Sequence, residues 1–188
     1  MLIFITGPSG VGKSTLRDYY YKAKNITPLP ALTTRPHREG ETEIHKTISN
    51  EHFMQLYGED KLCLVAKNHG NLYGYLSNEI ENLIYSSEVA LIEVDSRTAI
   101  EYAVKYNASI VRVIPSSEEI AVKKIETKRD DVEDRLKDFK QQMEASFLSQ
   151  RLKENDIVFV NNYDKLSTDK FCELIDFLYR DGMYNKKQ

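Results

Sequence analysis

The stretch GPSGVGKST, residues 7–15, places three glycines ahead of a lysine and two hydroxyl residues. Gly7, Gly12, Lys13 and Ser14 satisfy the pattern G-x-x-x-x-G-K-[ST]. Glycines let the backbone curl until its N–H groups converge on phosphate oxygens, and the start of the following helix adds partial positive charge. Lys13 would reach the β and γ phosphates, and the Ser14 hydroxyl would bind Mg²⁺. The pattern predicts ATP or GTP binding, with contacts from Gly7, Ser9, Gly10, Val11, Gly12, Lys13, Ser14 and Thr15.

Glu93 and Asp95, at the end of the apolar run ALIEVD, provide a second element for chemistry. They alternate around Val94, so they face the same side only if the strand ends there. The carboxyl edge of such a sheet is where ligands bind. We expect one carboxylate to hold metal-bound water and the other to face a second substrate, which makes Ser14, Glu93 and Asp95 the predicted metal set. The alternative is that both are ordinary strand-terminal carboxylates.

The elements around these residues predict an α/β fold with a parallel sheet. Apolar, β-branched runs at 2–6, 89–95, 108–114 and 156–162 alternate with helical patterns, and strands that are apolar throughout are typical of a parallel sheet covered on both faces. Ser116, three residues before Glu119, forms a capping-box pattern. The expected helices cover 13–23, 97–106, about 116–128, about 132–153, and a last segment with Phe171, Leu174, Ile175 and Leu178 on one face.

The section from 32 to 84 has a different pattern, because its short runs alternate imperfectly between apolar and polar residues. It predicts a small mixed α/β insertion. At 188 residues the chain is too short for two ordinary α/β domains. We therefore expect one domain, with 1–31 and 85–188 as the core, 32–84 as the insertion and a charged connection near 128–135.

Composition limits the partners. The formal net charge of −3 gives no basic footprint for nucleic acid. Cys63 and Cys172 are 109 positions apart with no CxxC spacing, which suggests neither a zinc site nor a disulfide framework. The N-terminal apolar run is too short for a signal peptide or a membrane span. These features predict a cytoplasmic protein without nucleic-acid or membrane partners; they predict no oligomeric state.

Five segments that follow the phosphate loop resemble, in order, landmarks of the guanylate kinase family: TTRPHREGE (33–41), GNLYG (70–74), LIEVD (91–95), KRDDVEDRL (128–136) and VFVNN (158–162). The resemblance spans nearly the whole chain. It implies a P-loop nucleoside monophosphate kinase fold, a three-layer parallel sheet flanked by helices with a small acceptor-binding insertion and a short charged lid. It also implies an enzyme that moves the γ-phosphoryl group of Mg²⁺-bound ATP to GMP or dGMP.

The resemblance also implies roles for individual residues. Arg35 and Arg38 match the arginines that bind the acceptor phosphate, where two guanidinium groups suit a phosphate dianion. The remaining acceptor-side positions are His45, Tyr73 and Asp95. Arg129 and Arg135 resemble lid arginines that stabilise the transferring phosphoryl group, although the lid lacks the family's GRG stretch and Arg129 could belong to a solvated charge run. Asn161 matches an asparagine near the adenosine, with a turn-forming role as the alternative.

The acceptor-base positions depart from the family. Its guanine-reading serine, glutamate and small hydroxyl residue are replaced by Ala31, Leu64 and Tyr75. Similar departures occur in ribose 1,5-bisphosphate phosphokinases, which carry a Ser-Arg pair like Ser96 and Arg97. The acceptor therefore stays open between GMP and a sugar phosphate that would yield PRPP. A guanylate-kinase-like binding module is a third reading, disfavoured by the intact phosphate loop.

Overall fold

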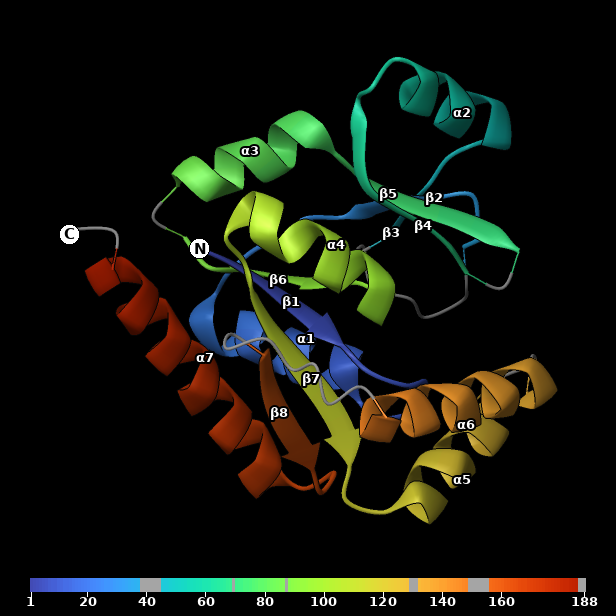
Figure 1. The fold of residues 1–188 in the computed structure, drawn as a ribbon, viewed down its shortest axis with the longest axis vertical. Helices are drawn as coiled ribbons and strands as arrows, with labels where there is room; N and C mark the ends of the chain where they lie inside the picture. Colours follow the sequence, from blue (N-terminus) through green and yellow to red (C-terminus); the bar gives the residue numbers. More distant parts are fainter. Residues whose placement is uncertain (38–44, 69, 87, 129–131, 149–155, 186–188) are drawn as a thin grey trace.

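The computed structural model describes residues 1–37, 45–68, 70–86, 88–128, 132–148 and 156–185, which form two sheets with helices around them (Figure 1). The main sheet has the order β6-β1-β7-β8. Its strands pair in parallel throughout, which confirms the predicted fold class. They are β1 (Leu2–Thr6), β6 (Ala90–Glu93), β7 (Ser109–Pro115) and β8 (Asp156–Asn161).

Seven helices belong to the described part of the chain: α1 (Lys13–Lys24), α2 (Asn50–Gly58), α3 (Ser77–Tyr85), α4 (Ser96–Tyr106), α5 (Glu118–Lys128), α6 (Val132–Leu148) and α7 (Lys165–Asn185). The predicted helix 132–153 is described as far as Leu148; its remainder lies outside the described residues. The capping prediction at Ser116 is wrong by one residue, because the Ser117 hydroxyl accepts from the Ile120 N–H and α5 begins at Glu118.

Alternate residues of β1 point to the two faces of the main sheet, and both faces are covered. Ile3 and Ile5 belong to a buried cluster with α1, α5, α6 and α7. Leu2 and Phe4 belong to a second cluster with α3 and α4. All five β1 residues are buried, as expected for a continuous apolar strand in a parallel sheet. Full burial of each of the four apolar side chains, Leu2 to Ile5, stabilises the fold by about 1.5–3 kcal/mol.

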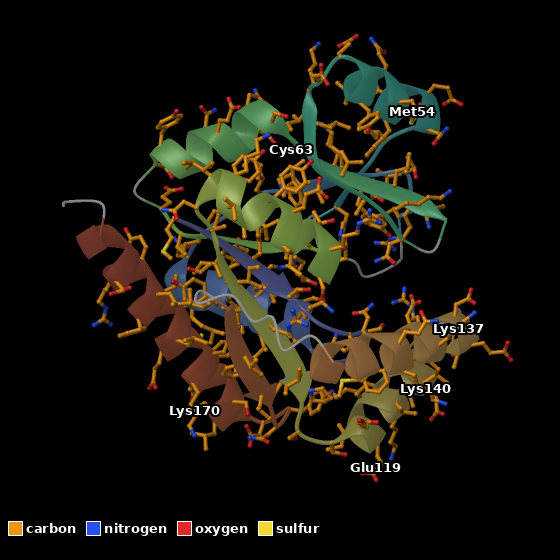
Figure 2. All side chains as sticks on the ribbon, in the orientation of Figure 1. Met54, Cys63, Glu119, Lys137, Lys140 and Lys170 are labelled. Atoms are coloured by element: carbon orange, nitrogen blue, oxygen red, sulfur yellow. The ribbon has the colours of Figure 1, made fainter. Side chains whose placement is uncertain are left out.

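The smaller sheet is mixed and has the order β3-β2-β5-β4. It consists of β2 (Ala31–Thr33), β3 (His45–Thr47), β4 (Leu62–Asn68) and β5 (Asn71–Leu76). Only the β2–β3 pair is parallel among the pairs of this sheet in the described residues. The β4–β5 register shifts between Cys63 and Ala66, and Leu64 within that bulge has a left-handed φ of 53°. Figure 2 places the Cys63 side chain where this sheet meets α3 and α4, so the two sheets share a buried cluster.

The outer edge of β6 is closed by a side chain. The Ala90 and Val94 N–H groups donate inward, to carbonyls of Met1 and Ile5. The Leu91 backbone points outward, where the Tyr21 hydroxyl donates to its carbonyl at 2.9 Å and accepts from its N–H at 2.8 Å. A single tyrosine thus satisfies both backbone groups of this residue.

No helix in the described part of the chain is long and apolar enough to cross a bilayer. On α6, Lys137 and Lys140 point outward into solvent (Figure 2).

Candidate functional site

The phosphate loop joins β1 to α1 in a conformation that requires its glycines. Gly7 has φ 136°, and a Cβ there would lie 2.1 Å from the Val113 carbonyl oxygen. Gly12 has φ 88° at the N-cap of α1. L-residues with a side chain rarely adopt such φ values, so only glycine permits this curl without strain. The first turn of α1 has no acidic residue, which leaves its partial positive charge available to an anion.

Lys13 folds back over the loop. Its ammonium donates to the carbonyls of Gly7 at 2.7 Å and Pro8 at 2.8 Å. Ser14 and Thr15 follow it, exposed on the first turn of α1. The ammonium, the helix start and these hydroxyls are therefore gathered at one point, and a hydroxyl here suits Mg²⁺ that arrives with nucleotide phosphates.

The end of β8 and the turn that follows it contact the phosphate loop. The Asn161 side chain, 4% exposed, donates to the Val11 carbonyl at 2.9 Å and accepts from the Tyr163 N–H at 2.9 Å. The Tyr163 hydroxyl donates to the Gly10 carbonyl at 3.3 Å. Burial raises the pKa of that hydroxyl to about 12, so it remains a donor at neutral pH. Asn161 thus makes the turn considered as its alternative role, and it also contacts the phosphate loop.

Among the described residues of the predicted lid segment, Arg135 contacts the phosphate loop. Arg135 on α6 donates from Nη1 to the Ser9 hydroxyl at 3.1 Å. This contact brings a predicted lid residue to the phosphate site, although the two lie 126 positions apart in sequence. Arg129 lies outside the described residues.

Glu93 is the last residue of β6, whereas Asp95 lies two residues beyond it, and the two carboxylates have different partners. Asp95 is the N-cap of α4; its carboxylate accepts from the N–H groups of Arg97 and Thr98 and, at 2.6 Å, from the Thr98 hydroxyl. Glu93 forms an ion pair with Arg17. Across the described residues, His, Cys, Asp and Glu side chains nowhere gather in threes as a metal site would need. The metal roles of Glu93 and Asp95 stay predictions, and both carboxylates already have protein partners.

The predicted acceptor-phosphate residues lie at the end of β2 and on its neighbours. Arg35 is buried at 8% exposure, and its backbone is held by the Thr33 and Thr47 hydroxyls. His45 and Tyr73 come from the strands on either side of β2, and their rings meet edge to face at 6.1 Å. Tyr73 pairs with Thr33 at the end of β2 that leads to Arg35, whereas His45 pairs with Ala31 at the start of that strand and meets Tyr73 through its ring. Arg38 lies outside the described residues.

The three positions that read guanine in the family are part of the hydrophobic core. Ala31, Leu64 and Tyr75 are 4%, 2% and 5% exposed and belong to the same buried cluster as Phe4. Leu64 takes its place through the β4 bulge. Neither the Ala31 nor the Leu64 side chain has a polar group that could pair with the polar edge of a purine.

Arg17 and Tyr163 contact the site but were not singled out from the sequence. Arg17 lies on the buried face of α1 with Leu16, Tyr20 and Tyr21. A charged residue on an otherwise apolar helix face was a readable signal, because such a charge needs a buried partner. Tyr163 had no signal, since its contact depends on how the turn after β8 meets the loop.

Comparisons with known proteins agree with this arrangement. The sequence model of the guanylate kinase family matches residues 1–176. Guanylate kinase of Agrobacterium fabrum is 34% identical over 116 residues, 60% of this chain and 53% of that protein, so the match spans about half of the relative. Guanylate kinase of Fusobacterium nucleatum is 26% identical over 182 residues, 93% of this chain and 95% of that protein. A crystal structure of guanylate kinase from Anaplasma phagocytophilum has the same fold, with a TM-score of 0.73 at 20% identity over 95% of this chain and 86% of that one.

Proposed function

The chain belongs to the guanylate kinase family, and on that premise we propose that it transfers the γ-phosphoryl group of ATP to the phosphate of a small acceptor, GMP or dGMP by family. The observation that carries the proposal is the phosphate loop, with Lys13 folded over it at 2.7 Å from the Gly7 carbonyl. An eroded loop would instead favour a binding module. Phosphoryl transfer depends mainly on positioning and charge stabilisation, which is what such a loop supplies.

On the donor side, the loop N–H groups would bind the β and γ phosphates, and Lys13 would exchange its carbonyl partners for phosphate oxygens. The Ser14 hydroxyl would hold the Mg²⁺ of Mg·ATP, which supplies charge neutralisation at the phosphates. Asn161 and Tyr163 would keep the loop in its phosphate-binding shape.

On the acceptor side, Arg35 and Arg38 would bind the acceptor phosphate and align one oxygen with the γ-phosphorus. As the new P–O bond forms, the bond to the oxygen bridging the β and γ phosphates breaks and ADP leaves. Arg135, released from Ser9, would stabilise the charge that spreads over the transferring group. His45 and Tyr73 would donate to the acceptor phosphate from the strands on either side of β2. Asp95, predicted on the acceptor side, would stay after the end of β6 as the N-cap of α4.

A second acceptor, ribose 1,5-bisphosphate, is favoured by one observation, the burial of Ala31, Leu64 and Tyr75 in a single cluster. A glutamate that pairs with guanine N–H groups would make charge-assisted hydrogen bonds of about 1.5–3 kcal/mol each, and Leu64 makes none. A sugar phosphate has no base to be read. The product would then be PRPP in place of GDP.

Purified protein incubated with Mg·ATP and GMP, dGMP, other nucleoside monophosphates or ribose 1,5-bisphosphate will decide the acceptor, with ADP release as the readout. GMP turnover without sugar-phosphate turnover establishes the family reaction, and the reverse establishes the second candidate. If none of these acceptors gives ADP release, or if calorimetry shows no ATP binding, the kinase proposal is overturned.

A further inference from the structure

Arg17 is a buried cation on the phosphate-loop helix, one turn after Lys13. Its side chain is 5% exposed. Burying a guanidinium is costly unless it is paired. Two carboxylates pair with it: Glu93 Oε1 lies 2.7 Å from Nη1, and Asp18 Oδ1 accepts from Nη2 at 2.9 Å and Nε at 3.0 Å. Burial acts to lower the pKa of Arg17, but the Glu93 and Asp18 charges raise it above its ordinary value.

The ion pair fixes Glu93 without hiding it. The Glu93 side chain is 21% exposed at the carboxyl end of β6, beside Ile5 of β1, the strand that leads into the phosphate loop. Oε1 is buried and paired with Arg17, while the side chain as a whole stays partly exposed. Since one guanidinium faces two carboxylates, this group has a net charge of −1. It therefore repels phosphate and attracts hydroxyl or N–H donors.

Tyr75 links the same group to the smaller sheet. It lies on β5, is 5% exposed, and interacts electrostatically with both Arg17 and Glu93. Burial raises the pKa of its hydroxyl, which therefore stays neutral. The ion-pair group thus joins the phosphate-loop helix to the end of β6, and Tyr75 lies on β5, the strand that also carries the predicted acceptor residue Tyr73.

We propose that Glu93, held in place by Arg17, recognises the part of the acceptor that is not phosphate, by accepting a hydrogen bond from one of its hydroxyl or N–H groups. The inference rests on the proposed function. It assigns Glu93 to the acceptor in place of the metal and makes Arg17 a positioning residue. It also supplies polar recognition that Ala31 and Leu64 lack, and it applies to either candidate acceptor because both carry ribose hydroxyls.

The test compares Glu93→Gln with the wild-type protein, using whichever of GMP and ribose 1,5-bisphosphate the wild type phosphorylates. The amide keeps the size of the side chain but removes its charge. We expect the acceptor KM to rise about tenfold, because the hydrogen bond to the acceptor loses its charge assistance. The KM for ATP and the Mg²⁺ concentration that gives half-maximal rate should not change. An unchanged acceptor KM, or a higher Mg²⁺ requirement, would overturn the inference.

Variants of the partners test the positioning role. Arg17→Met should raise the acceptor KM as Glu93→Gln does, and Arg17→Lys should restore part of the affinity because it keeps the charge but loses the guanidinium fork. Asp18→Asn is the matched control: it neutralises the other carboxylate beside Arg17 but leaves the Arg17–Glu93 ion pair, so it should raise the acceptor KM much less than Glu93→Gln does. If the Arg17→Met variant had the same acceptor KM as the wild type, the positioning role would be refuted. Failure of the wild type to phosphorylate either acceptor would overturn the proposed function as well, whereas normal wild-type turnover with an unaffected Glu93→Gln variant would overturn this inference alone.

Discussion

Replacing Asn161 by alanine should weaken phosphate binding by the phosphate loop without unfolding the protein. The change removes the donor to the Val11 carbonyl and the acceptor for the Tyr163 N–H, both at 2.9 Å from a side chain that is 4% exposed. Each backbone group left without its partner costs about 1–3 kcal/mol. The total of about 2–6 kcal/mol is below most of the range of typical domain stabilities, about 5–15 kcal/mol. The folded state should persist at 25 °C with a lower unfolding midpoint in urea.

The same substitution separates the two roles considered for Asn161. If it maintains the loop, calorimetry should show the Kd of Mg·ATP and the Kd of magnesium tripolyphosphate rising by the same factor, about 10-fold or more, because the loop binds phosphates. If it contacts the nucleoside, ATP alone should lose affinity, and that result would refute the reasoning from the structure. Asn162→Ala is the matched control, since that neighbouring residue is exposed, and it should bind both ligands as the wild type does.

Three further predictions concern catalysis and stability. Lys13→Ala should abolish ADP release with every acceptor while its circular dichroism stays that of the wild type, and residual turnover near the wild-type rate would exclude Lys13 from catalysis. Arg38→Ala should raise the acceptor KM and lower kcat together, because the arginine would both bind and align the phosphate; if steady-state kinetics show neither change, the acceptor site is elsewhere. Burial raises the pKa of Tyr21 to about 12 from an ordinary 10. The neutral phenol therefore adds about 2–3 kcal/mol to the free energy of unfolding below pH 10, and this contribution is lost as the pH rises toward 12. Between pH 9 and 11.5, the free energy of unfolding in urea should fall less steeply with pH in Tyr21→Phe than in the wild type. An equal slope in the two proteins would contradict this prediction.

The parallel strands could be read from the sequence because burial on both faces leaves a continuous apolar run. Leu2–Thr6 was predicted to the residue, as the structure has it. The bulge that turns Leu64 into the core could not be read, because a left-handed φ at a leucine depends on its pairing with β5. The capping pattern at Ser116 was wrong by one position, since Ser117 is an equally good capping residue and only the helix geometry distinguishes them.

The phosphate loop was predictable because its chemistry needs fixed residue types at fixed spacing. Contacts between elements that are far apart in the sequence were not predictable. Arg17 and Glu93 lie on different elements, and their ion pair depends on how α1 packs against β6. Asp95 carried a local signal that could have been given more weight, since an aspartate directly before a helix is a preferred N-cap.

The Tyr21 hydroxyl on Leu91 also bears on self-association. β6 is an outer strand of the main sheet, and an outer strand with free backbone groups is a template for another chain to add a strand. At the middle of this four-residue strand, the outward donor and acceptor are both occupied by one phenol. An incoming strand would first have to displace a buried side chain of the phosphate-loop helix. The start of α1 therefore contributes to the phosphate site, and a side chain near its end disfavours the addition of a strand from another chain.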